Sequence, residues 1–526
     1  MRSWAPANTT MILRAARLAA DGGPNHMHLT MLLQMAAEGA GDRIAIGSRA
    51  DGITMAGLAE RAQRAGTVFT ERPGERVVLV DLNSEAVPIA LFGAALAGKP
   101  FVPVNYRLTD EQLRDLVVRT APATVVVGDG IAERLGSIDG IEVLERKELL
   151  ALAVDTDVAL APLEMGDPDD IAVLLYTSGT TGAPKAAVLR HRNLAAYIIT
   201  SVEFAGADED EAVIVSVPPY HIAAMSSVLS STYAGRRVVQ IESFEPQVWV
   251  DTVRAQGVTH AMVVPTMLNR ILDVIDADGG GLPSLRALSY GGGPMPLPVI
   301  ERAMGLLPDV GFVNAYGLTE TSSTISLLGP DDHREAFASD DPAVRARLGS
   351  VGRPLPGVEV SIRDADGEPV IGDERGEIWV QGEQVSGEYL GRGEGLDDGW
   401  FHTRDAGNLD EAGFLYVHGR LDDVIVRGGE NLSPGEIESV LVEHPTVEAA
   451  AVVGIPDTEW GEKVMAAVVP APGASVDEDE LRDFVRAALR STKTPERIDI
   501  RTELPFNETG KLLRRVLRDE LTDKFG

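Results

Sequence analysis

The sequence contains no cysteine among its 526 residues. That absence excludes a disulfide framework, a zinc site built on thiolates and a cysteine nucleophile. Basic residues are also scarce, because 47 Lys and Arg stand against 80 Asp and Glu and leave a net charge of −33. This charge argues against a general surface for nucleic acid or anionic membranes, so a polyanionic substrate would need local cations and backbone amides.

Long apolar runs are missing as well. No stretch approaches the roughly 20 uninterrupted apolar residues that span a bilayer, and residues 1–26 lack the apolar core and small-residue cleavage site of a signal peptide. We therefore expect no membrane span and a cytoplasmic location. No internal repeat of fixed period occurs, which argues against solenoids and propellers.

Along the chain, strand-like patterns alternate with helix-like patterns. The chain is too long for one hydrophobic core, so we expect more than one domain. The patterns predict buried strands at 76–82, 101–104, 171–176, 212–217 and 261–264, an N-cap at Thr30, and a capping box at Thr109 and Gln112. Residues 377–420 predict a β-rich subdomain. Beyond them, Ser433 and Glu436 predict a capped helix, and 449–454 and 464–469 predict paired strands. The expected class is multidomain α/β with a small C-terminal α+β unit.

The strongest local signal is the decapeptide Tyr-Thr-Ser-Gly-Thr-Thr-Gly-Ala-Pro-Lys at 176–185, directly after a predicted strand. Its candidate phosphate-binding groups are the backbone amides at Gly179 and Gly182, the hydroxyls of Thr177, Ser178, Thr180 and Thr181, and the ammonium of Lys185. The glycine spacing differs from that of a Walker A motif. A phosphate-binding loop is the favoured interpretation, and a flexible polar turn is the alternative.

Two further segments carry glycine beside polar groups. Gly291, Gly292, Gly293 and Pro294 follow a predicted strand and would let a flat purine or an acyl chain lie against bare backbone. Residues 316–320 read Tyr-Gly-Leu-Thr-Glu. The Glu320 carboxylate could face a triphosphate only through a divalent cation, since like charges repel, and Mg²⁺ is the natural inference. Ordinary turns and a helix cap are the structural alternatives.

These three segments, in this order, resemble the ATP-binding motifs of the adenylate-forming superfamily of acyl- and aryl-CoA synthetases, non-ribosomal peptide adenylation domains and beetle luciferases. Further motifs of that superfamily follow in order at 402–405, 419–423, 427–431 and 507–511, and ordered motifs are hard to obtain by chance. The resemblance implies an N-terminal extension (1–26), an ATP- and acyl-binding adenylating domain (27–420) and a mobile C-terminal domain (421–526).

The resemblance also implies individual roles for nucleotide-binding residues. By this resemblance, the loop from Thr177 to Lys185 binds the pyrophosphoryl part of ATP, and the loop from Gly291 to Pro294, with Tyr316 and Gly317, contacts the adenine. Thr319 contacts phosphate and Glu320 binds Mg²⁺. Asp405 and Arg420 bind the ribose hydroxyls. Next to Asp405, Arg404 stands where many members of the superfamily have Gly.

Three implied roles concern the C-terminal region. Lys511 resembles the catalytic lysine that bridges the acid and the α-phosphate of ATP, where a cation lowers the repulsion between two anions. Asp422 matches the hinge about which the small domain swings, because this lysine must leave before a thiol can enter. The loop of Gly428, Gly429 and Glu430 resembles the lining of the pantetheine tunnel for coenzyme A.

His221 resembles the gate of the acyl pocket, although a lone histidine is more often structural. The small residues Ala223, Ala224, Ser226 and Ser227 follow it and favour a roomy, largely apolar pocket for a bulky, aryl or medium-to-long acid. The expected enzyme is an AMP-forming acyl-CoA synthetase that uses a carboxylic acid, ATP and CoA.

Three alternatives differ from this expectation in what they require of the sequence. An amino-acid-activating domain would need an acidic partner for the substrate ammonium, and residues 218–221 offer none. Transfer to the pantetheine arm of a separate acyl carrier protein remains open. A silent nucleotide-binding regulator would be expected to have lost Lys511 or Glu320, and both are present. Neither the acid nor the oligomeric state follows from the sequence.

Overall fold

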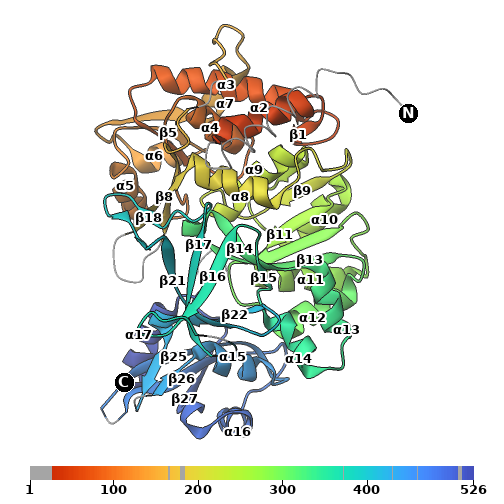
Figure 1. The fold of residues 1–526 in the computed structure, drawn as a ribbon, viewed down its shortest axis with the longest axis vertical. Coiled ribbons are helices and arrows are strands. Elements are labelled where there is room, and N and C mark those ends of the chain that lie inside the picture. Colours follow the sequence, from red (N-terminus) through yellow and green to blue (C-terminus); the bar gives the residue numbers. More distant parts are fainter. Residues whose placement is uncertain are drawn as a thin grey trace.

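The chain folds into a large N-terminal α/β domain and a smaller C-terminal domain, shown in blue in Figure 1. This computed structural model describes residues 27–163, 166–177, 184–370, 372, 374–428, 430–458, 460–506 and 512–526. The predicted α/β class with a β-rich subdomain is confirmed. Across these ranges, no helix combines the length and apolar character needed to cross a membrane.

One sheet of the large domain ends in the predicted phosphate-binding hairpin. Its strand order is β19-β18-β8-β7-β4-β3-β5-β6, with neighbours parallel from β7 to β6 and antiparallel from β7 to β19. The bounds are β3 (Arg76–Val80), β4 (Phe101–Pro103), β5 (Ala123–Val127), β6 (Ile141–Glu145), β7 (Ile171–Thr177), β8 (Lys185–Arg190), β18 (Glu388–Tyr389) and β19 (Gly393–Glu394). The central strands are valine-rich and buried on both faces, as parallel strands require.

A second large sheet carries the other two predicted nucleotide segments at the ends of β12 and β13. Its order is β15-β14-β13-β12-β11-β9-β10-β1-β2. The bounds are β1 (Ile44–Ile46), β2 (Ile53–Thr54), β9 (Ala212–Val215), β10 (Arg237–Gln240), β11 (His260–Val263), β12 (Ala287–Gly291), β13 (Gly311–Leu318), β14 (Ser323–Leu328) and β15 (Arg353–Pro354), with the 3₁₀ turn η2 (Thr319–Thr321) between β13 and β14.

Helices cover these sheets, and one predicted start is correct while another is wrong. Thr109 and Gln112 form the expected capping box at α5. Thr30 is not the N-cap of α2, because the helix begins at Leu29 and its N-cap is His28, whose ring accepts the hydrogen bond from the Thr30 amide. The bounds are α2 (Leu29–Gly39), α3 (Met55–Glu71), α4 (Ala86–Leu96), α5 (Asp110–Val118), α6 (Ile131–Leu135), α7 (Arg146–Val154), α8 (His191–Ser201), α9 (Ile222–Ala234), α10 (Pro246–Gln256), α11 (Pro265–Asp278), α12 (Leu297–Leu306), α13 (Pro330–Ala338), α14 (Pro342–Arg345) and η3 (Ala346–Gly349).

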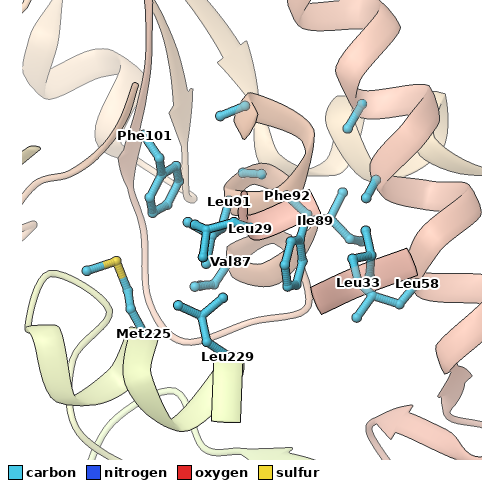
Figure 2. Close-up of a cluster of buried hydrophobic side chains, with 14 of the residues drawn as sticks. Leu29, Leu33, Leu58, Val87, Ile89, Leu91, Phe92, Phe101, Met225 and Leu229 are labelled. Carbon is cyan, nitrogen blue, oxygen red and sulfur yellow. The ribbon is translucent and has the colours of Figure 1, made fainter. Parts of the chain in front are cut away.

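The main hydrophobic core lies between the helices that cover the first sheet and α9, which covers the second sheet. Helix α4 is apolar on every side and is buried along almost its whole length. Figure 2 shows its Val87, Ile89 and Phe92 among side chains from α2, α3 and α9. This shared core joins the two sheets into one domain, so their nucleotide segments are held in a fixed relation.

A β-rich subdomain and the small domain complete the fold. The subdomain contains β16 (Val358–Arg363), β17 (Gly376–Gly382), β20 (Leu396–Asp397), β21 (Trp400–Leu409) and β22 (Leu415–Arg420). After the 3₁₀ turn η4 (Leu421–Asp423), the small domain contains β23 (Ile425–Arg427), β24 (Glu430–Leu432), α15 (Pro434–Val442), β25 (Val447–Asp457), β26 (Gly461–Pro470), α16 (Glu478–Ala488), η5 (Ser491–Lys493), β27 (Arg497–Ile500) and α17 (Arg514–Phe525). The predicted pairing of 449–454 with 464–469 is confirmed in β25 and β26.

Candidate active site

The predicted phosphate loop lies at the end of an antiparallel hairpin. Thr177, the last residue of β7, pairs with Lys185, the first residue of β8. The Thr177 hydroxyl lies 3.4 Å from the Lys185 carbonyl oxygen as a hydrogen-bond donor. Ser178, Gly179, Thr180, Thr181 and Gly182 lie outside the described residues, so the structure fixes only the base of this predicted loop.

The Tyr316–Glu320 segment requires glycine at its centre for a steric reason. A Cβ atom at Gly317 would overlap the carbonyl oxygen of Ser323, because the chain turns back through η2 into β14. Gly291 is constrained in the same way, since a Cβ there would overlap the Ala315 carbonyl oxygen on the neighbouring strand. Gly292 has a φ of +80°, and a Cβ at Gly293 would meet open space. Part of this glycine pattern is therefore explained by strand packing.

Glu320 lies beside a residue that the sequence did not single out. Its side chain is buried, and its Oε1 accepts a hydrogen bond from the hydroxyl of Tyr389 at 2.5 Å. Tyr389 belongs to β18, which pairs with β8, and the Lys185 ammonium lies 5.7 Å from the centre of its ring. Burial, and then the Glu320 carboxylate, raise the pKa of Tyr389, so this hydroxyl remains a donor at neutral pH.

The backbone around Glu320 is also held by the segment that leads to Tyr389. The amides of Ser386 and Gly387 donate to the Glu320 carbonyl oxygen at 2.8 and 3.2 Å. The buried Gln384 amide donates to the carbonyls of Thr321 and Thr324 at 3.0 and 2.7 Å. No sequence signal pointed to these contacts, because the Gln384 and Tyr389 side chains lie at least 60 residues along the chain from their partners. Thr319 begins η2 beside this segment, and its phosphate contact stays a prediction from the resemblance.

The predicted ribose-binding pair, Asp405 and Arg420, is brought together across two strands. The residues face each other on β21 and β22, and the Arg420 Nε lies 2.9 Å from Asp405 Oδ1. The Tyr316 hydroxyl donates to Asp405 Oδ2 at 2.6 Å. Burial, and then the Asp405 carboxylate, raise the pKa of Tyr316, which keeps it a donor. Tyr316 and Asp405, which come from two distant motifs, therefore meet, and their predicted roles at one nucleotide stay a prediction.

One short segment connects the two groups of residues. Tyr316 contacts Asp405, and Glu320, four residues later, contacts Tyr389. The Arg420 guanidinium acts on both tyrosines electrostatically, lowering each pKa against the larger effect of burial. The residues predicted to contact the base, the ribose and the phosphates are thus connected through the turn between β13 and β14. Within the described ranges, no group of three or more Asp, Glu and His side chains suits a metal ion, and the Mg²⁺ role of Glu320 stays a prediction.

His221 immediately precedes α9, with its ring 4.6 Å from that of Tyr220. Its Nε2 atom is buried without a hydrogen-bond partner among the described residues. Burial, and then the nearby Arg107, lower the pKa of His221 to about 4, so the ring is neutral at pH 7. A buried neutral imidazole with an unused nitrogen can accept from or donate to a bound molecule.

The predicted pantetheine loop lies in the small domain. Gly428 has a φ of +58°, its amide donates to the Trp460 carbonyl oxygen at 2.7 Å, and a Cβ there would crowd the Trp460 ring. A cavity of about 290 Å³ is lined by Arg427, Gly428, Glu430, Trp460, Ser491 and Thr492. Gly429 and Lys511 lie outside the described residues, so their predicted roles are not tested by the geometry.

The predicted cap of α15 is wrong in its contacts, although the helix begins where expected. The Ser433 hydroxyl donates to the His418 carbonyl oxygen of β22 at 2.8 Å and makes no cap hydrogen bond. Glu436 pairs with Lys493 at 2.6 Å. The reason is tertiary: both side chains find partners outside the helix, and Ser433 thereby joins the small domain to the large one.

Comparisons with known proteins agree with this geometry. The AMP-binding enzyme model matches residues 33–390, and the model of the AMP-binding enzyme C-terminal domain matches residues 436–511. The chain is 34% identical to a feruloyl-CoA synthase of Amycolatopsis sp. over 88% of this chain and 91% of that protein. It is 34% identical to a fatty acid–[acyl-carrier-protein] ligase, ScoC, of Streptomyces coeruleorubidus over 85% of this chain and 87% of that protein.

A solved structure shares the complete architecture. ATP-bound MatB from Rhodopseudomonas palustris superposes with a TM-score of 0.83 at 27% identity, covering 95% of this chain and all of that one. Family models, relatives and structure all span both domains. This chain belongs to the AMP-binding enzyme family, the adenylate-forming superfamily that its motifs resemble.

Proposed function

We propose that this protein is an AMP-forming acyl- or aryl-CoA ligase. In the first step a carboxylate oxygen attacks the α-phosphorus of ATP, forming acyl-AMP and releasing pyrophosphate. In the second step a thiol sulfur attacks the acyl carbon, forming a thioester and releasing AMP, while the thiol proton passes to solvent or a base. The observation that carries this function is that Asp405, with its partner Arg420, and Tyr389 meet the two ends of one segment, Tyr316 and Glu320.

The residues divide into nucleotide-facing and reaction-facing groups. Asp405 and Arg420 would hold the ribose, because a carboxylate can accept hydrogen bonds from a diol. Tyr316 and the backbone from Gly291 to Pro294 would flank the adenine. The hairpin base at Thr177 and Lys185, with the intervening loop, would hold the phosphates. When bound, Mg²⁺ would neutralise phosphate charge, with Glu320 as its protein ligand.

Lys511 would supply the cation at which the two anions meet. The C-terminal domain, 421–526, would then move about Asp422 so that the thiol can enter past Gly428, Gly429 and Glu430. This part of the chain has two hydrophobic cores of its own, built only from residues between Ile425 and Phe525. Such self-contained packing supports treating it as one moving body.

The acid is proposed to be aryl or medium-to-long rather than acetate. The relatives include a feruloyl-CoA synthase and a ligase for fatty acids. His221 precedes α9, and the small side chains at Ala223, Ala224, Ser226 and Ser227 on that helix would leave room for a bulky acyl group. CoA is the proposed acceptor. A carrier protein is the second candidate, because one relative of 34% identity is named as an acyl-carrier-protein ligase.

The first prediction tests the catalytic cation. Lys511→Ala should lower the rate of acid-dependent pyrophosphate release by several orders of magnitude, because the repulsion between carboxylate and phosphate is no longer offset. The measurement uses purified protein, ATP, Mg²⁺ and a panel of aliphatic, aryl and polycyclic acids. Arg515→Ala is the matched control, since it removes an exposed cation four residues farther along the chain. Near-normal pyrophosphate release from Lys511→Ala would refute the assigned role.

The acceptor is decided in the same assay by adding either CoA or a holo acyl carrier protein after the adenylate has formed. Thioester formation with CoA and not with the carrier supports the proposed ligase. The reverse result would move the protein to the carrier-loading class. Absence of any AMP ester with every acid would overturn the function as a whole.

A further inference from the structure

The segment that joins the two domains carries two adjacent carboxylates, and each pairs with an arginine on a different side. In η4, Asp422 Oδ1 lies 2.5 Å from a terminal nitrogen of Arg404, which belongs to β21 of the large domain. The next residue, Asp423, lies 3.3 Å from Arg514, which begins α17 of the small domain. The joint is therefore held by one ion pair from each domain.

Arg404 occupies a backbone conformation that disfavours its side chain. Its φ is +60°, in the left-handed region that glycine adopts freely and that costs energy for a residue with a Cβ atom. The conformation is fixed locally, because the Arg404 amide donates to Glu377 Oε1 at 3.1 Å. The arginine therefore adds a contact to the hinge at the expense of backbone strain.

The pair on the other side is firmly part of the small domain. The Arg514 side chain is four-fifths buried, donates to Glu438 Oε2 at 2.7 Å and donates to the Val452 carbonyl oxygen at 2.8 Å. Glu438 lies on α15 and Val452 on β25, so Arg514 anchors Asp423 to the small-domain core. A rotation of the chain at Asp422 would carry Asp423 and Arg514 together.

We propose that Arg404 is a positioning residue that holds the hinge at Asp422 in the domain arrangement seen here. A rotation that separates the domains breaks the Arg404–Asp422 pair and leaves the Asp423–Arg514 pair intact, so Arg404 biases the balance between arrangements. Arg404 also adjoins Asp405, whose partner Arg420 is the last residue before η4. This proposal rests on the proposed function in one respect only: the two domain arrangements are taken to serve adenylation and thioester formation in turn.

The absence of cysteine makes a direct test possible, because two introduced cysteines are the only labelling sites. Ala338→Cys at the end of α13 and Ala487→Cys in α16 place spin labels at exposed positions in the two domains. Electron–electron double resonance then gives the population of each interdomain distance. Arg404→Asn removes the charge while keeping a residue that tolerates positive φ. We expect it to lower the population of the present arrangement about two- to fivefold, the range for an exposed ion pair.

Three comparisons separate hinge positioning from a merely structural role. Arg404→Gly should shift the populations as Arg404→Asn does while leaving the melting temperature unchanged or higher, because glycine suits the φ. Arg254→Ala breaks an ion pair of 2.6 Å within the large domain and should leave the populations unchanged. Salt at about 1 M should bring the wild type towards the Arg404→Asn distribution, since exposed pairs are screened.

Exchanging the two charges of the pair provides the decisive experiment. Arg404→Asp alone and Asp422→Arg alone place like charges together and should depopulate the present arrangement, and the double variant should restore it. Unchanged distributions in Arg404→Asn, or failure of the exchange to restore the wild-type distribution, would overturn the proposal. These distances are measured without turnover, so they stand apart from the pyrophosphate assay that tests the proposed function.

Discussion

At the scale of single residues, each of the two carboxylates proposed to face the nucleotide is held by a tyrosine. Tyr316 donates to Asp405 and Tyr389 donates to Glu320. Both tyrosines have a raised pKa, because burial and the adjacent carboxylate disfavour the phenolate. Each therefore remains a donor that fixes one carboxylate oxygen. The other oxygen is left available to Arg420 in the case of Asp405, and to the proposed Mg²⁺ in the case of Glu320.

Tyr389→Phe is the prediction that belongs to this scale. Removing the hydroxyl takes this donor from the buried Glu320 carboxylate, a loss of about 1.5–3 kcal/mol for a hydrogen bond to a charged group. We expect kcat/KM for ATP to fall at least about tenfold and the Mg²⁺ concentration for half-maximal activity to rise. A Mg²⁺ titration of pyrophosphate release provides the measurement. Glu320→Gln should cost more, and an unaltered titration for Tyr389→Phe would separate this tyrosine from the metal site.

At the scale of elements, two histidines connect the start of α2 to the start of α8. The rings of His28 and His191 stack with centroids 3.4 Å apart and an angle of 24° between their planes. Burial lowers the pKa of His28 to about 4, an effect that Asp167 partly opposes. Burial, and then His28, hold the pKa of His191 well below its ordinary value. The contact is therefore stable only while both rings are neutral.

This stack predicts a loss of stability in acid. The folded pKa lies below the unfolded value of 6.5, so the unfolded chain binds more protons as the pH falls. The stabilisation is complete above pH 6.5 and declines towards pH 4; for His28 it amounts to about 3 kcal/mol. We expect the unfolding free energy of His191→Phe to fall less steeply over this window in denaturant titrations. Parallel pH curves for the variant and the wild type would contradict the assignment.

Helix starts illustrate how far local patterns reach at this scale. The capping box of Thr109 and Gln112 forms as predicted, because its two partners are three residues apart and bond to each other. Ser433 and Glu436 have the same spacing, yet His418 and Lys493 take their side chains. The helix boundary could be predicted in both cases, and the cap contacts only in the first.

At the scale of the whole molecule, the small domain is built as a separate body. Its sheet, β24-β23-β26-β25 with β27 beside β26, does not continue into any sheet of the large domain within the described residues. Contacts between the two include the Ser433 hydroxyl on the His418 carbonyl oxygen and the Arg375–Glu436 pair at 3.7 Å. Small, polar contacts of this kind allow domains to move against each other.

Calorimetry of the intact protein should therefore show two unfolding transitions. ATP with Mg²⁺ should raise the unfolding free energy of the large domain by about 2.7 kcal/mol at a ligand concentration of about 100 Kd, because all the proposed nucleotide contacts except Lys511 come from that domain. The small-domain transition should move much less. A single transition whose calorimetric and van't Hoff enthalpies agree would show that the two bodies unfold as one cooperative unit.

Periodicity along the chain was enough to predict several buried strands, because it is a property of neighbouring residues. The family was predicted from the resemblance of the ordered motifs to those of the adenylate-forming superfamily. The roles of Lys511, Gly429 and residues 178–182 remain predictions from that resemblance. Two contacts became visible only in the folded molecule: Tyr389 holds Glu320 from 69 residues away, and Arg404 reaches Asp422. Such pairs depend on how the sheets pack and where the chain crosses between domains, and a local pattern carries no record of either.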